Sequence, residues 1–290
     1  MFHESKYAIY SLIPQHYYPA TIFIKGGTPF EQALQAMVTK GITYPFIAKP
    51  DRGERGLGVM KICSSSDLQT YMEKMPVDFI IQEYVDYPLE FSVFYVRHPL
   101  EKRGKITSIT FKDLLKVTGD GKTSIEGLVM KNDRAFLQLE KLKKERHDLH
   151  HVLALREERI LVPYGNHSRG TRFEDCCNLI DEQLTTTFDT LSHQIEGFYY
   201  GRYDLRTTSI EEMRAGRNIA ILELNGAKAE VAHIYNPRFS FLKAQWVIMT
   251  HFKLMWQIAM HNKNTSPFIS FSTFLKGRRE EAQYKRRIRM

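Results

Sequence analysis

The chain has 290 residues, of which 43% are hydrophobic and 26% charged, so it is long and apolar enough to fold around a sizeable core. It contains no run of about 18 apolar residues and no apolar leader at its N-terminus, so we expect a cytoplasmic protein with no membrane partner. The three cysteines, at 63, 176 and 177, form no CxxC pair and are expected to be reduced thiols.

A formal net charge of +8 raises the question of nucleic-acid binding. The segment 276–290 holds seven Lys/Arg against two Glu and accounts for most of this excess. Such a tail can contact RNA or acidic lipid, but we interpret it as a solvated helix end. A basic nucleic-acid-binding protein that uses this tail is therefore the least favoured of the functions considered.

Strand and helix patterns alternate through the first part of the chain. A helix pattern with Thr28 as its N-cap and Pro29 in its first turn ends at Gly41. A glycine-rich turn follows at 51–58, and a short helix is expected over 68–75. Strands are predicted on either side of these features, at 20–25, 43–50, 59–63 and 77–85.

The second part continues with strands at 90–97 and 105–112, and with a charged stretch at 138–159 that we interpret as a solvated helix. An amphipathic helix is predicted over 179–198, and a long helix from Ser240 to about His261. Helices and strands follow no strict βαβ rhythm. The predicted fold class is therefore α+β, with mostly antiparallel sheets.

Three polar residues fall in two short alternating segments, GRYDLR at 201–206 and ILELNG at 221–226, which a charged turn joins. If these segments pair as antiparallel strands, Asp204, Glu223 and Asn225 share one face. Two carboxylates and an amide oxygen are hard ligands of the kind that magnesium prefers. An ordinary hairpin with solvated acids is the alternative for this triplet alone.

A glycine-rich loop, AKPDRGERGLGV at 48–59, follows directly on a predicted strand. Its glycines Gly53, Gly56 and Gly58 allow the backbone to fold closely over a ligand, and Lys49 at the strand end suits a phosphate. A buried strand ending in QEYV at 82–85, with Glu90 beyond it, could present backbone groups to adenine and a carboxylate to ribose. Together these features indicate nucleotide binding.

In this order the motifs resemble the ATP-grasp superfamily, and within it the D-alanine–D-alanine ligase-like branch. The similarity runs from about Lys6 to Pro237. It rests on four blocks: KPxxGxxGxG at 49–58, QEYV at 82–85 followed by Glu90, GRYD at 201–204, and ELNG at 223–226. The resemblance implies two lobes that clamp ATP between their sheets, with Mg²⁺ (or Mn²⁺) as the metal. The helices expected at the C-terminus lie beyond the similar region.

The resemblance also implies roles for individual residues. Lys49 and the less distinctive Lys6 would contact phosphate beneath a flap containing Gly53, Gly56 and Gly58. Gln82, Glu83 and Val85 would form the adenine hinge, and Glu90 would bind ribose. Asp204, Glu223 and Asn225 would hold the metal. Arg202 would act with Lys49 as a catalytic residue by steadying the transferred phosphoryl group.

Two departures from that branch limit what can be carried over. The resemblance begins almost at Met1, so the additional N-terminal domain of these ligases is expected to be absent or supplied otherwise. After Asn225 the chain reads GAKAEVAHIYNP instead of a serine-containing turn, so D-alanine specificity is not expected. The predicted organisation is a small lobe at 1–84, a large lobe at 85–239 and a helical extension at 240–290.

The expected function is an ATP-dependent carboxylate–amine ligase that works through an acyl phosphate on small-molecule substrates. An ATP-grasp kinase that phosphorylates a small acceptor is the alternative. Substrate-site candidates are the polar residues of two segments, namely His167 and Arg169, and Lys228, Glu230 and His233. The identity of both substrates and the oligomeric state stay open.

Overall fold

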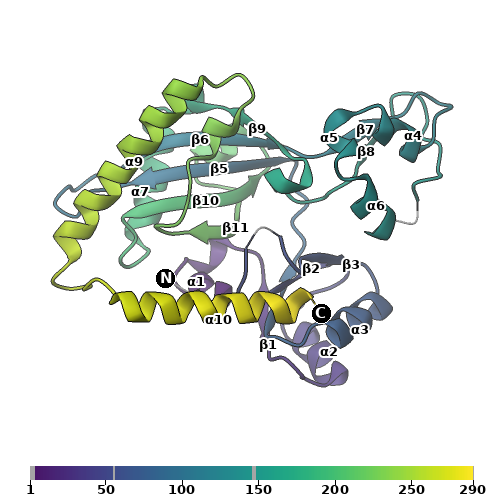
Figure 1. The fold of residues 1–290 in the computed structure, drawn as a ribbon, viewed down its shortest axis with the longest axis horizontal. Coiled ribbons are helices and arrows are strands. Elements are labelled where there is room, and N and C mark those ends of the chain that lie inside the picture. The colour runs from purple at the N-terminus through teal and green to yellow at the C-terminus, as the bar shows by residue number, and fades with distance from the viewer. Residues whose placement is uncertain (1–3, 55, 146–147, 290) are drawn as a thin grey trace.

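The computed structural model describes residues 4–54, 56–145 and 148–289 and contains two larger antiparallel sheets, a small unit with a third, two-stranded sheet, and two C-terminal helices (Figure 1). The predicted fold class, α+β with mostly antiparallel sheets, is confirmed. Within the described residues, no helix is long and apolar enough to cross a membrane.

The small lobe is a four-stranded sheet with strand order β1-β4-β2-β3. The helices α2 and α3 contribute Ala33, Met37 and Leu68 to its core. The observed α2 begins at Phe30, two residues after the predicted N-cap, because Pro29 occupies the cap position. The elements are α1 (Lys6–Tyr10), a 3-10 turn (Gln15–Tyr17), β1 (Thr21–Ile24), α2 (Phe30–Thr39), β2 (Phe46–Pro50), β3 (Met60–Ile62), α3 (Ser65–Lys74) and β4 (Phe79–Glu83).

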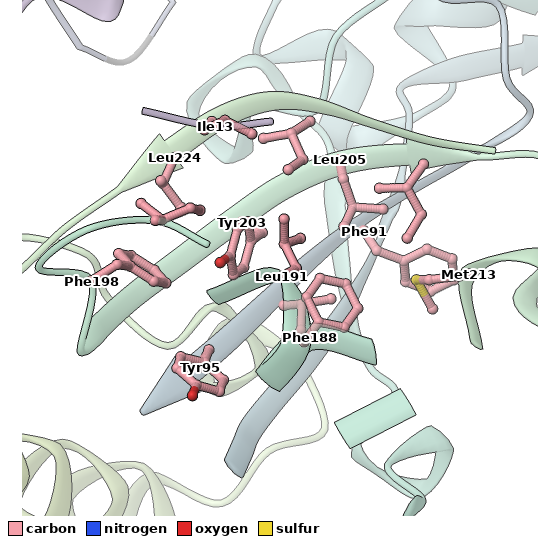
Figure 2. Packing of buried hydrophobic residues seen from close by; sticks show 14 of the residues in the cluster. Ile13, Phe91, Tyr95, Phe188, Leu191, Phe198, Tyr203, Leu205, Met213 and Leu224 are labelled. Atoms are coloured by element: carbon pink, nitrogen blue, oxygen red, sulfur yellow. The ribbon is translucent and has the colours of Figure 1, made fainter. Parts of the chain in front are cut away.

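The large lobe is a five-stranded sheet with strand order β11-β10-β5-β6-β9. The predicted amphipathic helix is α7 (Glu182–His193), which starts at the capping residue Asp181 and packs Leu184, Phe188 and Leu191 against the sheet (Figure 2). The expected turn between the last two strands contains a short helix, α8 (Ile210–Arg214). The strands are β5 (Leu89–Val96), β6 (Lys105–Asp113), β9 (Arg172–Asp175), β10 (Tyr200–Thr207) and β11 (Ile219–Asn225).

A separate unit with its own core is inserted between β6 and β9 (Figure 1). The prediction of one solvated helix over 138–159 is wrong, because α6 spans only Leu139–Glu145. Leu142 and Leu153 are fully buried, so this leucine pattern fills a core. The other elements of this unit are β7 (Lys116–Thr118), α4 (Ile125–Met130), α5 (Asp133–Phe136), β8 (Glu158–Ile160) and a 3-10 turn (His167–Arg169). Another 3-10 turn (Cys177–Leu179) lies outside it, between β9 and α7.

The C-terminal segment follows a 3-10 turn (Ala232–Tyr235) and forms two long helices, α9 (Phe241–Asn262) and α10 (Phe271–Arg289). The basic tail lies in α10, which runs below the large sheet to the small lobe (Figure 1). Tyr284 and Ile288 pack against the small-lobe core, so one side of this helix is docked instead of solvated. The domain boundaries near 84 and 239 remain predictions.

Candidate active site between the two sheets

The hairpin that carries the three predicted metal ligands forms as expected, with β10 and β11 paired antiparallel. Asp204 lies directly opposite Glu223, and Arg202 lies opposite Asn225. The register shifts after Asp204, so Leu222 has no partner residue on β10. The bulge turns the Leu222 carbonyl toward the small lobe, where it accepts a hydrogen bond from Lys49 Nζ at 3.1 Å and another from the Tyr10 hydroxyl.

Asp204 is buried among donors on four sides. Arg202 donates from Nε (3.1 Å) and Nη2 (3.0 Å), and the Lys112 ammonium lies 3.1 Å away. Ser92 Oγ and Asn225 Nδ2 donate as well. Burial alone would raise the pKa of Asp204, but Arg202 and Lys112 hold this pKa well below its usual value.

Glu90, the predicted ribose ligand, is the second buried carboxylate of this cluster. It accepts from Arg206 Nε at 3.1 Å and from the Gly165 amide at 3.0 Å, and Lys112 Nζ lies 3.4 Å away. Lys112 therefore bridges Glu90 and Asp204. Both oxygens of Glu90 are engaged in this arrangement.

Sequence reasoning missed Lys112 and Arg206, although a signal exists for each. Alternation in GRYDLR places Arg206 on the same face as Arg202 and Asp204. The alternating segment KITSITFK places Lys112 on the face of Ser108 and Thr110, both of which are buried polar residues. A row of polar residues on one face of a buried strand indicates a polar site. On a surface strand, the same row would only face solvent.

Lys49 links the small sheet to the hairpin. Its ammonium donates to Gln82 Oε1 (2.9 Å), to the Tyr10 hydroxyl (3.0 Å) and to the Leu222 carbonyl. Burial lowers the pKa of Lys49 to about 8, and the nearby Glu223 carboxylate opposes this shift. Gln82 in turn donates to Thr21 Oγ1 at 2.9 Å, so this predicted hinge residue positions the lysine.

Lys6 approaches the same place from α1. Its ammonium donates to the Gly53 carbonyl at 2.8 Å, at the start of the glycine-rich loop. Burial lowers the pKa of Lys6, and Glu223 again opposes the shift. The half-buried Lys6 and the buried Lys49 are therefore neighbouring cations, and both are influenced by the charge of Glu223.

The glycine-rich loop takes left-handed conformations at Gly53 (φ 126°), Gly56 (φ 70°) and Gly58 (φ 69°). A Cβ on Gly58 would lie only 2.7 Å from Pro50 Cγ, so this position requires glycine for space as well as for φ. A Cβ on Gly56 would lie 3.0 Å from Asn166 Nδ2, which shows how closely the loop approaches the inserted unit. The loop is thus held between two parts of the protein.

A cavity of about 250 Å³ opens beside the predicted adenine hinge. Its wall contains Glu83 and Val85 from the hinge and Ile219 and Ala220 from β11. The Glu83 amide donates to the Ala20 carbonyl at 2.9 Å, and the Val85 carbonyl accepts from Arg206 Nη1 at 2.7 Å. The remaining wall comes from His16, Tyr18, Pro19, Tyr84, Asp86 and Tyr87.

The five predicted substrate residues do not form one group. Arg169 pairs with Glu145 at 2.5 Å in the inserted unit, and His233 is buried with its Nδ1 2.6 Å from Ser108 Oγ. The Glu230 carbonyl accepts from Arg202 Nη1 at 2.9 Å, and its carboxylate accepts from the Tyr235 hydroxyl.

The other two candidates are exposed. The ring of His167 lies 5.4 Å from that of Tyr235, and Lys228 lies within electrostatic range of Glu281 on α10. Glu230 and His167 therefore meet around Tyr235, beside Arg202.

No family model and no curated protein matches this sequence. Among solved structures, the chain is similar to a bifunctional glutathione synthetase from Pasteurella multocida, at 17% identity over 87% of this chain and 36% of that one, with a TM-score of 0.43. It is also similar to the VanG D-Ala:D-Ser ligase from Enterococcus faecalis, at 14% identity over 87% of this chain and 61% of that one, with a TM-score of 0.47.

The D-alanine–D-alanine ligase from Helicobacter pylori is a further similar structure, at 12% identity over 88% of this chain and 61% of that one, with a TM-score of 0.45. This chain thus spans between about a third and three fifths of the length of these proteins. At such low identity, the chemistry of the site rests on this chain's own residues.

The donor set at the hairpin fits a hard divalent cation in part. In the described residues, no group of three or more His, Cys, Asp or Glu side chains is arranged to hold a metal ion. The Glu223 carboxylate has no hydrogen bond or salt bridge to another described residue, and Asn225 uses only its Nδ2 toward Asp204, so both offer ligand oxygens. Both oxygens of Asp204 accept from neighbouring donors, so Asp204 would be open to a cation only if Arg202 or Lys112 moved from it.

The site brings basic and acidic side chains close together. Three carboxylates, Glu90, Asp204 and Glu223, lie among its basic side chains, and Asp51, Glu54 and Glu230 lie within electrostatic range of Lys6 or Arg202. The basic side chains could pair with the phosphates of a polyanion such as a triphosphate. They are Lys6, Lys49, Lys112, Arg202 and Arg206.

Proposed function

We propose that this protein is an ATP-dependent ligase that joins a small-molecule carboxylate to an amine through an acyl phosphate. The observation that carries the proposal is the hydrogen bond from Lys49 to the Leu222 carbonyl of the β10–β11 hairpin. A buried cation from one sheet touches the strand that bears Glu223 and Asn225 on the other, beside a cavity at the hinge. A nucleotide with its base in the cavity and its phosphates at Lys49 and Lys6 would join the two lobes.

Mg²⁺ (or Mn²⁺), when bound, would neutralise phosphate charge and align the transfer. Glu223 and Asn225 would hold the ion with their free oxygens, and Asp204 would join them as Arg202 turns toward the phosphoryl group. Glu90 would reach a ribose after releasing Lys112 or Arg206. These roles follow the sequence resemblance, and the open acceptors of Glu223 and Asn225 support them.

The reaction would proceed in two transfers. A substrate carboxylate oxygen attacks the terminal phosphorus of ATP, ADP leaves, and an acyl phosphate forms. The amine then attacks the acyl carbon, loses a proton, and displaces phosphate to give the amide. Arg202, which already bridges Asp204 and the Glu230 carbonyl, would stabilise the charge of both steps. The glycine-rich loop would keep water from the acyl phosphate.

A screen of ADP release tests this function directly. The protein is incubated with ATP and Mg²⁺ together with pools of small carboxylates and amines, and products are analysed by mass spectrometry. We expect ADP release that requires both a carboxylate and an amine, an amide product, and no turnover by Glu223→Gln. A phosphoester product would instead indicate a kinase. Equal ADP release by the wild type and Glu223→Gln, or none by the wild type with any pool, would overturn the proposal.

A further inference from the structure

Helix α9 is apolar on two opposite sides, but only one side is packed. Its inner side places His251 and Ile258 against the large sheet, with the His251 ring 4.8 Å from that of Phe94 and its Nδ1 3.2 Å from the Tyr200 hydroxyl. A helix that is apolar all round is normally covered all round. The outer side of α9 is instead exposed, so it lacks a partner among the described residues.

The outer side carries large side chains at helical spacing. Residues 242, 246, 249 and 256 follow i, i+4, i+7 and i+14, opposite His251 and Ile258. Two of them are tryptophans, Trp246 with 70% and Trp256 with 62% of its surface exposed. We call this surface the α9 face; its members are Phe241, Leu242, Trp246, Met249, Phe252 and Trp256, all more than half exposed.

The segment that carries the α9 face has charge of one sign. Between Val231 and Arg279 the sequence has seven Lys/Arg and no Asp or Glu. Lys243 and Lys253 are exposed on the helix itself, and Lys263 follows its end. Exposed apolar side chains continue into the link and the start of α10 at Phe268 and Phe271. Exposed aromatic, apolar and basic side chains thus follow one another along α9 and into the start of α10.

Charge complementarity selects the occupant of this face. A second copy paired symmetrically would set the same acid-free basic surface against itself, which costs free energy. A membrane with anionic lipids offers negative headgroups to the lysines and an acyl boundary to the apolar side chains. Tryptophan favours the membrane interface, and lysine stems extend from apolar surface to a charged layer.

We propose that the α9 face binds the surface of an anionic phospholipid membrane, with α9 lying in the interface plane. The expectation of no membrane partner rests on the length of apolar runs, and that criterion does not detect a helix that lies along a surface. The contact is independent of the nucleotide site, because α9 packs on the large sheet through Phe94 and Tyr200 and contributes no side chain to the Lys49–Asp204 cluster.

The chain carries its own probe for this contact. Trp246 and Trp256 are its only tryptophans, and both belong to the α9 face. Fluorescence of the full chain is measured with vesicles of phosphatidylcholine alone and of phosphatidylcholine mixed with phosphatidylglycerol, alongside vesicle flotation. We expect a blue shift and flotation with the mixed vesicles only, and reversal in about 1 M salt, where the Debye length is about 3 Å.

Matched variants separate the apolar and the electrostatic contributions. Lys243→Gln and Lys253→Gln should each weaken binding roughly fivefold, since a lysine near an anionic surface contributes about 1 kcal/mol. Leu242→Gln should weaken it about tenfold or more. Val38→Gln and Lys25→Gln, on the exposed surface of the small lobe, should change nothing.

Three outcomes overturn the proposal. The first is an unchanged emission spectrum and no flotation with the mixed vesicles. The second is equal binding to both kinds of vesicle. The third is a blue shift that depends on protein concentration without any vesicle, together with dimerisation in analytical ultracentrifugation, which assigns the α9 face to a second copy. Circular dichroism of each variant checks that α9 and the rest of the chain stay folded.

Discussion

Asp204 and Glu223 face each other across the β10–β11 pair, but only Asp204 is surrounded by cations. Arg202 and Lys112 both lie within 3.1 Å of Asp204, whereas Glu223 has no hydrogen bond or salt bridge to another described side chain. A carboxylate that is left open beside the buried Lys49 and the half-buried Lys6 could accept a metal or a ligand. The two acids should therefore respond differently to the loss of their charge.

We expect Asp204→Asn to lower the free energy of unfolding by about 3–5 kcal/mol, because it leaves buried cations without their partner. Glu223→Gln breaks no hydrogen bond or salt bridge among the described residues, so it should cost less stability than Asp204→Asn and still reduce ATP turnover by about 100-fold or more. Urea unfolding and ADP release measure the two effects. Near-normal turnover by Glu223→Gln at modest magnesium would contradict the metal assignment.

The ionisation of Lys49 predicts a pH dependence with a definite sign. Burial lowers its pKa to about 8, so in the protein without ATP it loses its charge above that pH. The value of kcat/KM for ATP should therefore fall about tenfold per pH unit above pH 8, and Lys49→Arg should remove this inflection. The stability contribution has the opposite sign: since the folded state favours neutral Lys49, stability from this group increases between about pH 8 and 10.5.

An absence of any inflection near pH 8 in the wild-type profile would argue against Lys49 as the phosphate ligand. Lys40→Arg, on an exposed lysine at the end of α2, serves as the control and should keep the wild-type profile. Unfolding by urea across the same pH range distinguishes loss of binding from loss of the folded state.

Arg202 connects Asp204 to the Glu230 carbonyl and is the side chain best placed to follow a transferred phosphoryl group. We expect Arg202→Ala to reduce kcat by about 100- to 1000-fold, as for loss of one preorganised donor. Arg202→Lys should recover little, because it cannot donate to two acceptors in a fork. Arg217→Ala, on an exposed arginine after α8, should leave kcat unchanged. A large rise in KM with normal kcat would instead assign Arg202 to substrate binding.

The β10–β11 hairpin could be predicted because alternation fixes which residues share a face. The pairing of β6 with β5, which brings Lys112 to Asp204, could not, since alternation says nothing about which strands are neighbours. Arg169 was expected at a substrate pocket from its glycine-bounded loop, but it pairs with Glu145. Glu145 belongs to the inserted unit, which has a leucine core. The high charge of 138–159 made this core hard to predict from the sequence.

Gly→Ala variants at two glycines with similar backbone angles distinguish the effect of backbone strain from the effect of displacing the glycine-rich loop. Gly58 (φ 69°) and Gly27 (φ 82°) both adopt the left-handed conformation, but a Cβ meets Pro50 at 2.7 Å only at Gly58. Both Gly→Ala variants should lose about 1–2 kcal/mol of stability from backbone strain. Only Gly58→Ala should raise KM for ATP, because it displaces the glycine-rich loop. Equal KM values in the two variants would show that this loop does not cover the nucleotide.

Substitution of Lys112 tests how much its charge stabilises the buried cluster. It lies between Glu90 at 3.4 Å and Asp204 at 3.1 Å, and is itself buried. We expect Lys112→Met to lose about 3 kcal/mol at pH 7, because two buried carboxylates then share fewer cations.

The loss should depend on pH in a defined direction. The lowered pKa of Asp204 contributes stability that is present above the unfolded pKa near 3.8 and is lost as pH falls through the folded value. The difference between Lys112→Met and wild type should therefore shrink below about pH 4. Lys116→Met removes a half-exposed lysine that pairs with Glu158 at 2.9 Å, and should cost less than about 1 kcal/mol at either pH. A Lys112→Met loss that stays constant down to the acid transition would show that packing of the lysine stem, and not its charge, stabilises this part of the sheet.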